Sequence, residues 1–458
     1  MSRNGKLSAL VLSAFLLAAF DATAANLTAT PTGGDCSGGT GGLQECLDVA
    51  VDNGEADTIT LEAGTYNEGT YTYNAAIPGE DFSLTLAGPA GGGAIIDGED
   101  TVLGLDLIAS GGGDSNTVFT IQGLTFVNGA DDAVQVSTVD ADTVVEDSVF
   151  RDNNGTIGGA LNIQSSDEGS VTVRNSTFSD NFADSAGGGL FVSVTLGNVT
   201  IENNLFERNS SNTFEGGAIN VETEGVDSTL IIANNVFSQN ESGADGGAGF
   251  LEVEDTGSAF IINNTIVGNT AAGDGGGFQV FADSTTQFNV YNNIFFENSA
   301  GALGDDLQIA ETGAAIALFN NLYSEVDIAC NGGGTGCISE GGNIVGEDPL
   351  FVDSAAGDFH LTADSPARDS GDPAAPEMPS TDFDGNPRPD QPGTNPDMGA
   401  FEFQAPIPTP TPTPTPTVGP QPEISGGGCN LGGSAASAGS VIGLGLSFLA
   451  FGALRRRH

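Results

Sequence analysis

Two adjacent pairs of aspartates could carry out hydrolytic chemistry, because paired carboxylates can act as general acid and general base on a glycosidic bond. The pairs are Asp131-Asp132 and Asp305-Asp306. Adjacent residues of a β-strand point to opposite faces of the sheet, which weakens both pairs as catalytic sites. His360 is isolated in the sequence, so we predict a structural role for it.

A cluster of oxygen-bearing side chains could bind a metal ion. It consists of Asp382, Asp384, Asn386 and Asp390. Such side chains are ligands for Ca²⁺, but Gly385 comes too early for an EF-hand loop. We interpret this segment as a structural turn, with Ca²⁺ binding as the alternative, and we expect no other cofactor.

The five cysteines form two close pairs and one single residue. Cys36 and Cys46 lie ten residues apart, Cys330 and Cys337 lie seven apart, and Cys429 stands alone. Neither pair has a histidine nearby, and the C-x2-C spacing of zinc sites is missing. We therefore predict two local disulfides, as is usual in exported proteins.

Charge and the amino-terminal residues indicate export. The 458-residue chain has 61 acidic and 10 basic residues, a net charge of −51, which excludes nucleic-acid binding because such a surface repels phosphate. Arg3 and Lys6 precede an apolar run over 7–20 and a small-residue segment over 22–24. This order is typical of a secretory signal peptide, which we assign to residues 1–24.

The carboxyl-terminal residues predict a spacer and a membrane segment. Residues 405–424 are rich in alternating Thr and Pro, which favours an extended polyproline spacer. Residues 435–454 carry no charge and are long enough to span a bilayer. The basic residues that follow suit the cytoplasmic side of a membrane, and they are Arg455, Arg456 and Arg457.

The middle of the chain repeats every 24 to 31 residues. A large apolar residue recurs at Phe126, Phe150, Phe178, Phe206, Phe237, Ile266, Phe295 and Tyr323. Five positions before each of these stands an aliphatic residue, such as Val173 or Ile201, which indicates strands with one buried face. Glycine clusters follow the repeated residue, and no helical period is present. This pattern predicts a parallel β-helix.

Two columns of polar residues accompany the apolar column. Asparagine recurs three positions before it, from Asn175 to Asn320, and three positions after it, from Asn153 to Asn298. We predict that both columns occupy tight bends and form amide ladders between coils. The same alignment places Arg174 beside Glu146 and Glu202, and Arg208 beside Asp180, as ion pairs between coils.

The amino-terminal part of the repeat region is predicted to protect the end of the solenoid. Residues 43–51 form an amphipathic pattern, and we expect a short helix that covers the core and is held by Cys36 and Cys46. Residues 57–61 and 64–66 are predicted to form the first coil. The segment from Glu55 to Tyr66 is similar to the phrase GADTI-x-L-x-x-GTY of bacterial β-helix surface proteins.

The motif F-x-x-N followed by G-G-A and an apolar residue resembles polymorphic outer membrane protein repeats. It occurs at 150–153 with 158–161, and at 206–209 with 216–219, within a match covering about residues 118 to 325. The resemblance implies a right-handed parallel β-helix on a bacterial surface and a role in adhesion. No autotransporter barrel follows, so that family's export route is not implied.

Two carboxyl-terminal segments carry further resemblances. Residues 343–403 include DPLFVD, DFDGNPRP and DMGAFEF and resemble the choice-of-anchor Q domain, which implies a segment that closes the β-helix. Gly426, Gly427, Gly428 and Cys429, with the apolar span and the arginine triplet, resemble tripartite sorting signals of Gram-negative bacteria. That resemblance implies a sorting protease as a partner and attachment of lipid or another group at Cys429. A permanent transmembrane anchor is the alternative.

These patterns divide the chain into a series of predicted segments. They are the signal peptide 1–24, the cap and first coils 25–117, the repeats 118–340, the closing segment 341–404, the linker 405–424 and the sorting signal 425–458. The predicted fold is all-β, a right-handed parallel β-helix solenoid with a short amino-terminal capping helix.

The predicted function is that of an exported, non-catalytic protein of a Gram-negative cell surface, outer membrane or extracellular space. We expect it to adhere to the cell envelope or to an extracellular glycan or protein. The alternative is a polysaccharide lyase or glycoside hydrolase of the pectate-lyase-like fold. Lyases usually use Lys or Arg as the base, and no lysine remains after removal of the signal peptide.

Overall fold

The computed structural model describes residues 25–404, with gaps at 53–54, 76–81, 110–116, 227, 256, 283–285, 313–314, 331–337 and 392. The predicted signal peptide, linker and sorting signal lie outside the described residues, together with Cys429 and the apolar span 435–454. No helix within the described part of the chain is long and apolar enough to cross a membrane.

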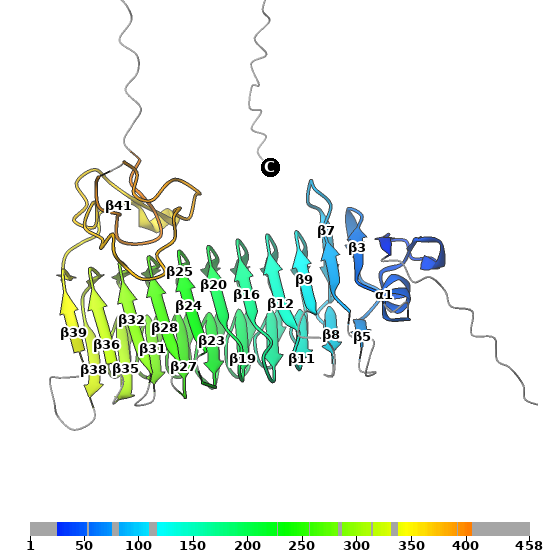
Figure 1. Cartoon of the computed structure of the whole chain (residues 1–458), viewed down its shortest axis with the longest axis horizontal. Coiled ribbons are helices and arrows are strands. Elements are labelled where there is room, and N and C mark those ends of the chain that lie inside the picture. The colour runs from blue at the N-terminus through cyan, green and yellow to red at the C-terminus, as the bar shows by residue number, and fades with distance from the viewer. Residues whose placement is uncertain are drawn as a thin grey trace, which may run out of the picture. The chain divides into compact units, whose positions relative to one another are not determined.

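Three long parallel sheets form the walls of the solenoid (Figure 1). The thirteen-stranded sheet contains β2 (Thr40–Gly41), β1 (Asn26–Ala29), β3 (Asp57–Leu61), β6 (Leu84–Ala87), β9 (Val118–Gln122), β12 (Asp142–Glu146), β16 (Val171–Arg174), β20 (Val199–Glu202), β24 (Thr229–Ala233), β28 (Ser258–Ile262), β32 (Gln287–Tyr291), β36 (Ala315–Phe319) and β39 (Ile338–Gly341). The eleven-stranded sheet contains β4 (Gly64–Tyr66), β7 (Ala94–Asp97), β10 (Thr125–Val127), β13 (Val149–Arg151), β17 (Thr177–Ser179), β21 (Leu205–Glu207), β25 (Val236–Ser238), β29 (Thr265–Val267), β33 (Ile294–Phe296), β37 (Leu322–Tyr323) and β40 (Ile344–Val345).

The third wall is the ten-stranded sheet. It contains β5 (Tyr71–Asn74), β8 (Leu105–Ala109), β11 (Val134–Thr138), β15 (Leu161–Ser165), β19 (Leu190–Val194), β23 (Ile219–Thr223), β27 (Gly249–Val253), β31 (Phe278–Ala282), β35 (Leu307–Thr312) and β38 (Val326–Cys330). A narrow six-stranded sheet precedes it in six coils, with β14 (Asn154–Gly155), β18 (Phe182–Ala183), β22 (Ser210–Ser211), β26 (Glu241–Ser242), β30 (Thr270–Ala271) and β34 (Ser299–Ala300). The predicted parallel β-helix is confirmed.

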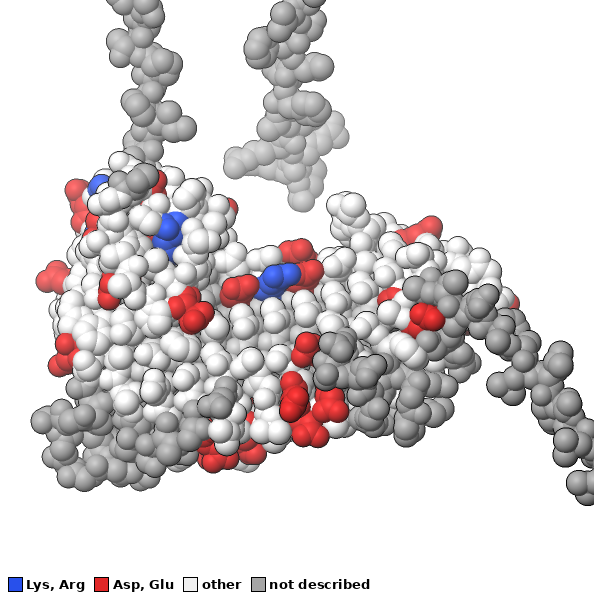
Figure 2. Space-filling view, in the orientation of Figure 1, with Lys and Arg blue, Asp and Glu red and all other residues white. Residues whose placement is uncertain are grey.

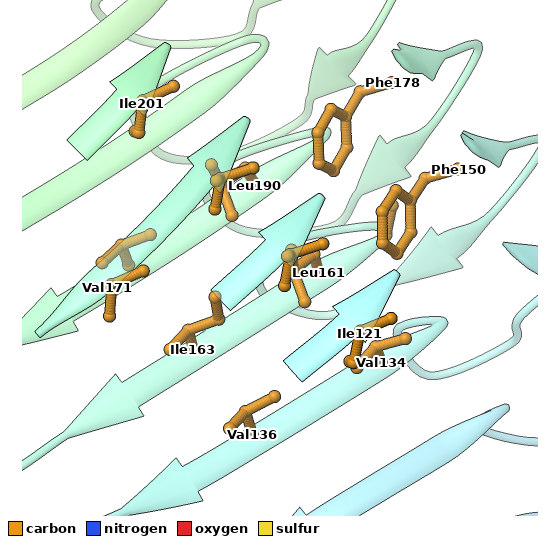
Figure 3. Close-up of a cluster of buried hydrophobic side chains, with 14 of the residues drawn as sticks. Ile121, Val134, Val136, Phe150, Leu161, Ile163, Val171, Phe178, Leu190 and Ile201 are labelled. Carbon is orange, nitrogen blue, oxygen red and sulfur yellow. The ribbon is translucent and has the colours of Figure 1, made fainter. Parts of the chain in front are cut away.

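The apolar column of the repeat is the core of the solenoid. Phe126, Phe150, Phe178, Phe206 and Phe237 pair in register from coil to coil, and their rings stack with centroids 4.7 to 5.0 Å apart. Figure 3 shows Phe150 and Phe178 in this stack, facing the aliphatic residues of the other walls. The predicted register is confirmed, since each coil places the same side chain over the one before it.

One of the two predicted amide ladders is confirmed. The side chains of the column three residues after the apolar residue donate from Nδ2 to Oδ1 of the next coil, at 2.8 to 3.0 Å. All of them are buried, and they are Asn153, Asn181, Asn209, Asn240, Asn269 and Asn298. Their amides also donate to backbone carbonyls, so this ladder satisfies polar groups inside the wall.

The second predicted ladder is shifted by one residue. The predicted column, which includes Asn175 and Asn203, has a left-handed backbone with φ between 51° and 60°. This conformation lets the following residue point inward. The continuous ladder is therefore formed by that next residue, with Nδ2–Oδ1 distances of 3.0 to 3.3 Å. Its members are Asn204, Asn235, Asn264, Asn293, Asn321 and Asn343.

The predicted ion pairs between coils are confirmed. Arg174 donates to Oε2 of Glu146 from Nε at 2.8 Å and from Nη2 at 2.5 Å, and it pairs in register with Glu202. Arg208 donates from two nitrogens to the two carboxylate oxygens of Asp180, both at 2.8 Å. Both arginine side chains are 44% exposed, so these pairs lie on the solvated surface.

The amino-terminal cap has the predicted helix and disulfide. Helix α1 (Leu43–Asp52) buries Leu43 and Leu47 against the first coils, and Cys36 and Cys46 are bonded. The structure adds β1, which pairs with β3 and so begins the sheet earlier than the sequence predicted. Cys330 ends β38 and Cys337 lies outside the described residues, so the second predicted disulfide stays a prediction.

The carboxyl-terminal segment packs on the flank of the coils instead of covering their end (Figure 1). It contains one antiparallel pair, β41 (Phe351–Asp353) and β42 (Asp358–Leu361). Phe359 and Phe401 pack against Val236 and Val267 of the eleven-stranded sheet. The outward bend asparagines of four successive coils bind its backbone oxygens, at 2.6 to 3.2 Å, and they are Asn234, Asn263, Asn292 and Asn320.

Candidate functional site

The two carboxylates of the first acid pair differ in exposure and in hydrogen-bond partners. Asp131 is exposed and accepts a hydrogen bond from Thr156, whereas Asp132 is buried and its Oδ2 accepts one from Asn162 at 3.1 Å. Burial raises the pKa of Asp132 to about 7. The two carboxylates therefore have separate environments.

The second acid pair supports the fold. Oδ1 of the buried Asp306 accepts from Asn298 at the end of the first amide ladder, and its Oδ2 accepts from the backbone N–H groups of Ser324 and Glu325. Asp305 accepts from the backbone of Ala300. Six strand spacings separate β11 from β35, roughly 30 Å, so the two pairs cannot act on one bond.

The segment around Asp382 is the structural turn that the sequence predicted, and protein donors hold it. Oδ1 of Asp382 accepts from the backbone of Asp384 and Asn386, and its Oδ2 accepts from the side chain of Asn386 and the backbone of Glu402. Gly385 is left-handed with φ 82°. Within the described residues no three His, Cys, Asp or Glu side chains are arranged to hold a metal ion.

His360 has the predicted structural role, although in space it is not isolated. Its Nδ1 lies 2.7 Å from Oδ1 of Asp358 and its Nε2 lies 2.7 Å from Oδ2 of Asp384, and its ring lies over Phe401. Burial opposes protonation, but the two carboxylates outweigh it and raise the pKa of His360. The ring therefore links two parts of the segment, at Asp358 and at Asp384.

The outward face of the ten-stranded sheet carries a continuous column that the sequence analysis missed. We call it the amide–phenylalanine column, and its members pair in register in the order Asp106, Gln135, Asn162, Phe191, Asn220, Phe250, Gln279 and Gln308. The intervening residues, such as Leu190 and Val221, point into the core. In the middle of the solenoid the column therefore alternates amide and phenylalanine.

Three oxygen atoms of this column are buried without a hydrogen-bond partner in the described structure. They are Oδ1 of Asp106, Oδ1 of Asn220 and Oε1 of Gln279. Asn220 is 2% exposed and lies in register between Phe191 and Phe250. An unpaired buried acceptor costs about 1–3 kcal/mol. These atoms are covered by the protein itself, and five members of the column are buried: Asn162, Phe191, Asn220, Gln279 and Gln308.

A group of glutamates lies beside the middle of the column. This glutamate patch consists of Glu215, Glu222, Glu224, Glu252 and Glu254. Glu222 and Glu252 are direct neighbours in register on β23 and β27. Burial first, and then the charges of the other glutamates, raise the pKa of both carboxyls, while Ser193 binds Glu222 and opposes the rise.

Hydroxyl and amide groups continue the face toward the amino terminus. An open depression beside the patch is lined by Ser137, Thr138, Gln164, Ser165, Ser166, Ser193 and Thr195. No strand of the ten-stranded sheet carries a lysine or arginine in its described residues, and each described arginine pairs with an acid elsewhere. Figure 2 shows acidic side chains scattered over the visible face of the solenoid and few basic ones.

The repeat spacing could have revealed the glutamate pair. Glu222 follows Gly216-Gly217 at the same offset at which Glu252 follows Gly246-Gly247. An alignment on the glycines therefore places the two carboxylates on adjacent strands. The sequence analysis searched for adjacent acids within one strand, whereas the acids that meet come from neighbouring coils.

Comparisons with known proteins support the architecture. The profile of a family described as a right-handed beta helix region matches residues 104–266. The crystal structure of pectate lyase Pel9A is similar, with a TM-score of 0.50 and 15% identity over 83% of this chain and 97% of that chain. At this identity the likeness shows the fold alone. A search of curated proteins finds no significant match.

Proposed function

We propose that this chain is an exported, surface-anchored and non-catalytic β-helix protein that adheres to extracellular polymers through the outward face of its ten-stranded sheet. The observation that carries the proposal is the solvent-facing part of this sheet, where the half-buried ring of Phe250 and the hydroxyl and amide groups of the open depression lie. Amides can bind hydroxyl groups, and aromatic rings can stack on the apolar faces of sugars. Because this face repeats over successive coils, it suits a long ligand better than a small one.

The proposed anchoring is supported by the sequence at the two chain ends. The signal peptide over 1–24 suits export, and the Thr/Pro linker over 405–424 suits a spacer between the solenoid and a surface. The tail over 425–458 is proposed to be recognised by a sorting protease, with Cys429 as the attachment site. The mass of the protein extracted from cell envelopes tests this, because cleavage and attached lipid would both change it.

The geometry of the glutamate patch favours binding over catalysis. Glu222 and Glu252 project from in-register positions on one face, so both carboxyls approach a bound chain from the same side. Glycoside hydrolysis needs two carboxyls that flank the scissile bond. The described strands of this sheet also lack the lysine or arginine base that lyases usually use.

A glycoside hydrolase remains the second candidate because of one observation. The raised pKa of Glu222 and Glu252 is typical of a carboxyl that donates a proton to a leaving group. Incubation of the chain with neutral and acidic polysaccharides, followed by measurement of new reducing ends and of unsaturated uronates, tests this. Product formation that is lost in Glu222→Gln would replace the adhesion proposal.

Binding of the purified chain to an array of polysaccharides tests the adhesion proposal. We expect binding to at least one polymer and about tenfold weaker binding for Phe250→Ala, whose ring lies half-buried in the column. Phe182→Ala is the matched control, because Phe182 is also half-buried but belongs to the six-stranded sheet. Equal loss in both variants, or no binding to any polymer, would contradict the proposal.

A further inference from the structure

The amino-terminal coil contains a buried carboxylate at a position that the next two coils fill with apolar side chains. Asp57 is the first residue of β3, is 4% exposed, and faces inward together with Ile59 and Leu61. In register with it, β6 and β9 place Leu84 and Phe119, each 1% exposed. A carboxylate at such a position lowers stability unless hydrogen bonds and a positive charge compensate its burial.

One hydrogen bond to this carboxylate comes from the residue that follows the predicted signal peptide. The backbone nitrogen of Ala25 donates to Oδ1 of Asp57 at 2.8 Å, and the carbonyl of Ala25 accepts from the backbone N–H of Thr58 at 3.1 Å. Ala25 is half-buried and packs against the core. Removal of residues 1–24 would turn this nitrogen into an α-ammonium group, which has three N–H donors and a positive charge.

The side chains of the amino-terminal coils do not supply such a charge. Residues 25–150 contain no lysine, arginine or histidine. The next residue, Arg151, lies on β13, three strands beyond β4 of the first coil and so roughly 14 Å along the axis, and it pairs with Asp152. Among the described residues, the amino terminus that cleavage creates is therefore the positive group placed to compensate Asp57.

We propose that cleavage between Ala24 and Ala25 creates an ion pair between the new α-ammonium group and Asp57, which completes the first coil. The inference rests on the proposed export and gives the removal of the signal peptide a role in folding. A signal peptidase adds one water across the peptide bond, so that Ala24 leaves as a carboxylate and the nitrogen of Ala25 becomes the ammonium. Before this step the nitrogen is an uncharged amide, and β1 and β3 are less stable, which suits a precursor that crosses a membrane unfolded.

The test compares the full chain from Ala25 onward with a free amino terminus and with an acetylated one. Acetylation keeps an N–H donor but removes the charge, so it imitates the precursor. Hydrogen exchange of residues 25–29 and 57–61 reports the stability of β1 and β3, and we expect it to be at least about tenfold slower with the free terminus. Asp57→Asn should abolish this difference. Glu62→Gln removes the same charge from an exposed residue and should keep it.

The outcomes separate this inference from the proposed export. Equal exchange in the free and acetylated chains, or equal loss of the difference in both variants, would overturn the ion pair and leave export standing. The amino-terminal residue of the protein isolated from cells is the second measurement. A shortened chain that begins at a residue other than Ala25 would overturn the inference alone, whereas retention of residues 1–24 would remove both proposals.

Discussion

The solenoid and its carboxyl-terminal segment use the same arginine–carboxylate chemistry in opposite environments. Arg174 and Arg208 form pairs with exposed side chains between coils. Arg388 is buried with Glu402 at 3.0 Å, with side chains 0% and 1% exposed. Burial lowers the pKa of Arg388 and raises that of Glu402.

This difference indicates what each pair does. Surface pairs contribute little to stability, and here they follow a register that the core already sets. A buried pair is tolerated only with further hydrogen bonds, and Arg388 also donates to Oδ1 of Asn234 and to the carbonyls of Asp397, Gly399 and Ala400. Arg388 therefore fastens the segment to the solenoid.

Removal of the Arg388 side chain should have the largest effect on stability. Arg388→Met leaves Glu402 buried without its partner, which typically costs about 3–5 kcal/mol. We expect the segment over 349–403 to detach or unfold first, which protease cleavage and hydrogen exchange within it would report. Arg368→Met is the control, because the side chain of Arg368 is 37% exposed and its contacts, with Asp369, the carbonyl of Ala363 and the ring of Phe403, all lie within the segment itself. Equal protection of the segment from protease and from hydrogen exchange in both variants would contradict the proposed difference between the buried and the exposed arginine.

Loss of an asparagine from the second amide ladder should have the next largest effect on stability. Asn235→Ala leaves the buried backbone N–H of Asn204 unpaired, at about 1–3 kcal/mol, and removes one donor from the carbonyl of Ile201. The free energy of unfolding in urea measures the loss. Asn203→Gly, one residue before the ladder, keeps the left-handed bend and should cost much less. A larger loss of stability in Asn203→Gly than in Asn235→Ala would indicate that the ladder is formed by the column that the sequence predicted.

A smaller effect should depend on pH. The pKa of His360 is raised, so its contribution to stability is present below about pH 6.5, the ordinary value, and is lost as pH rises through the raised pKa. The pKa of Asp358 is lowered mainly by its hydrogen bond with His360, so its contribution is lost only in strong acid. Thermal melting of His360→Gln between pH 5 and 9 should lack the alkaline loss seen in the unchanged chain. An identical pH profile would contradict this.

The smallest effect is expected for the exposed pairs. Arg174→Glu places three acids in one column, with Glu146 and Glu202, yet the cost should be about 1 kcal/mol or less in physiological salt. Melting temperatures at low and high salt measure it, since screening should reduce the difference. A loss as large as that of Arg388→Met would show that the surface pairs also hold the fold.

Local repetition explains why much of the fold could be predicted. The stacked phenylalanines and the left-handed bends recur at fixed offsets, and each depends only on neighbouring coils. The second ladder was misplaced because several coils have two consecutive asparagines, such as Asn234-Asn235 and Asn263-Asn264. The backbone angle φ of the first asparagine decides which of the two side chains points inward, and this angle cannot be deduced from the residue type.

Contacts between distant parts of the chain were beyond sequence reasoning. Nothing in the segment around Arg388 indicates that its partner on the solenoid is Asn234, 154 residues away. The glutamate pair was accessible in principle, because Glu222 and Glu252 share an offset from their glycines. The unpartnered acceptor of Asn220 could not be foreseen, because it depends on side-chain packing between neighbouring coils.

The lateral position of the carboxyl-terminal segment has a mechanical consequence. The bend asparagines from Asn234 to Asn320 all bind this segment, so it grips four successive coils at once. A pulling force transmitted along the chain beyond Gln404 would act first on this grip and would be shared among those coils. The terminal strand would then not be pulled away from the sheet alone.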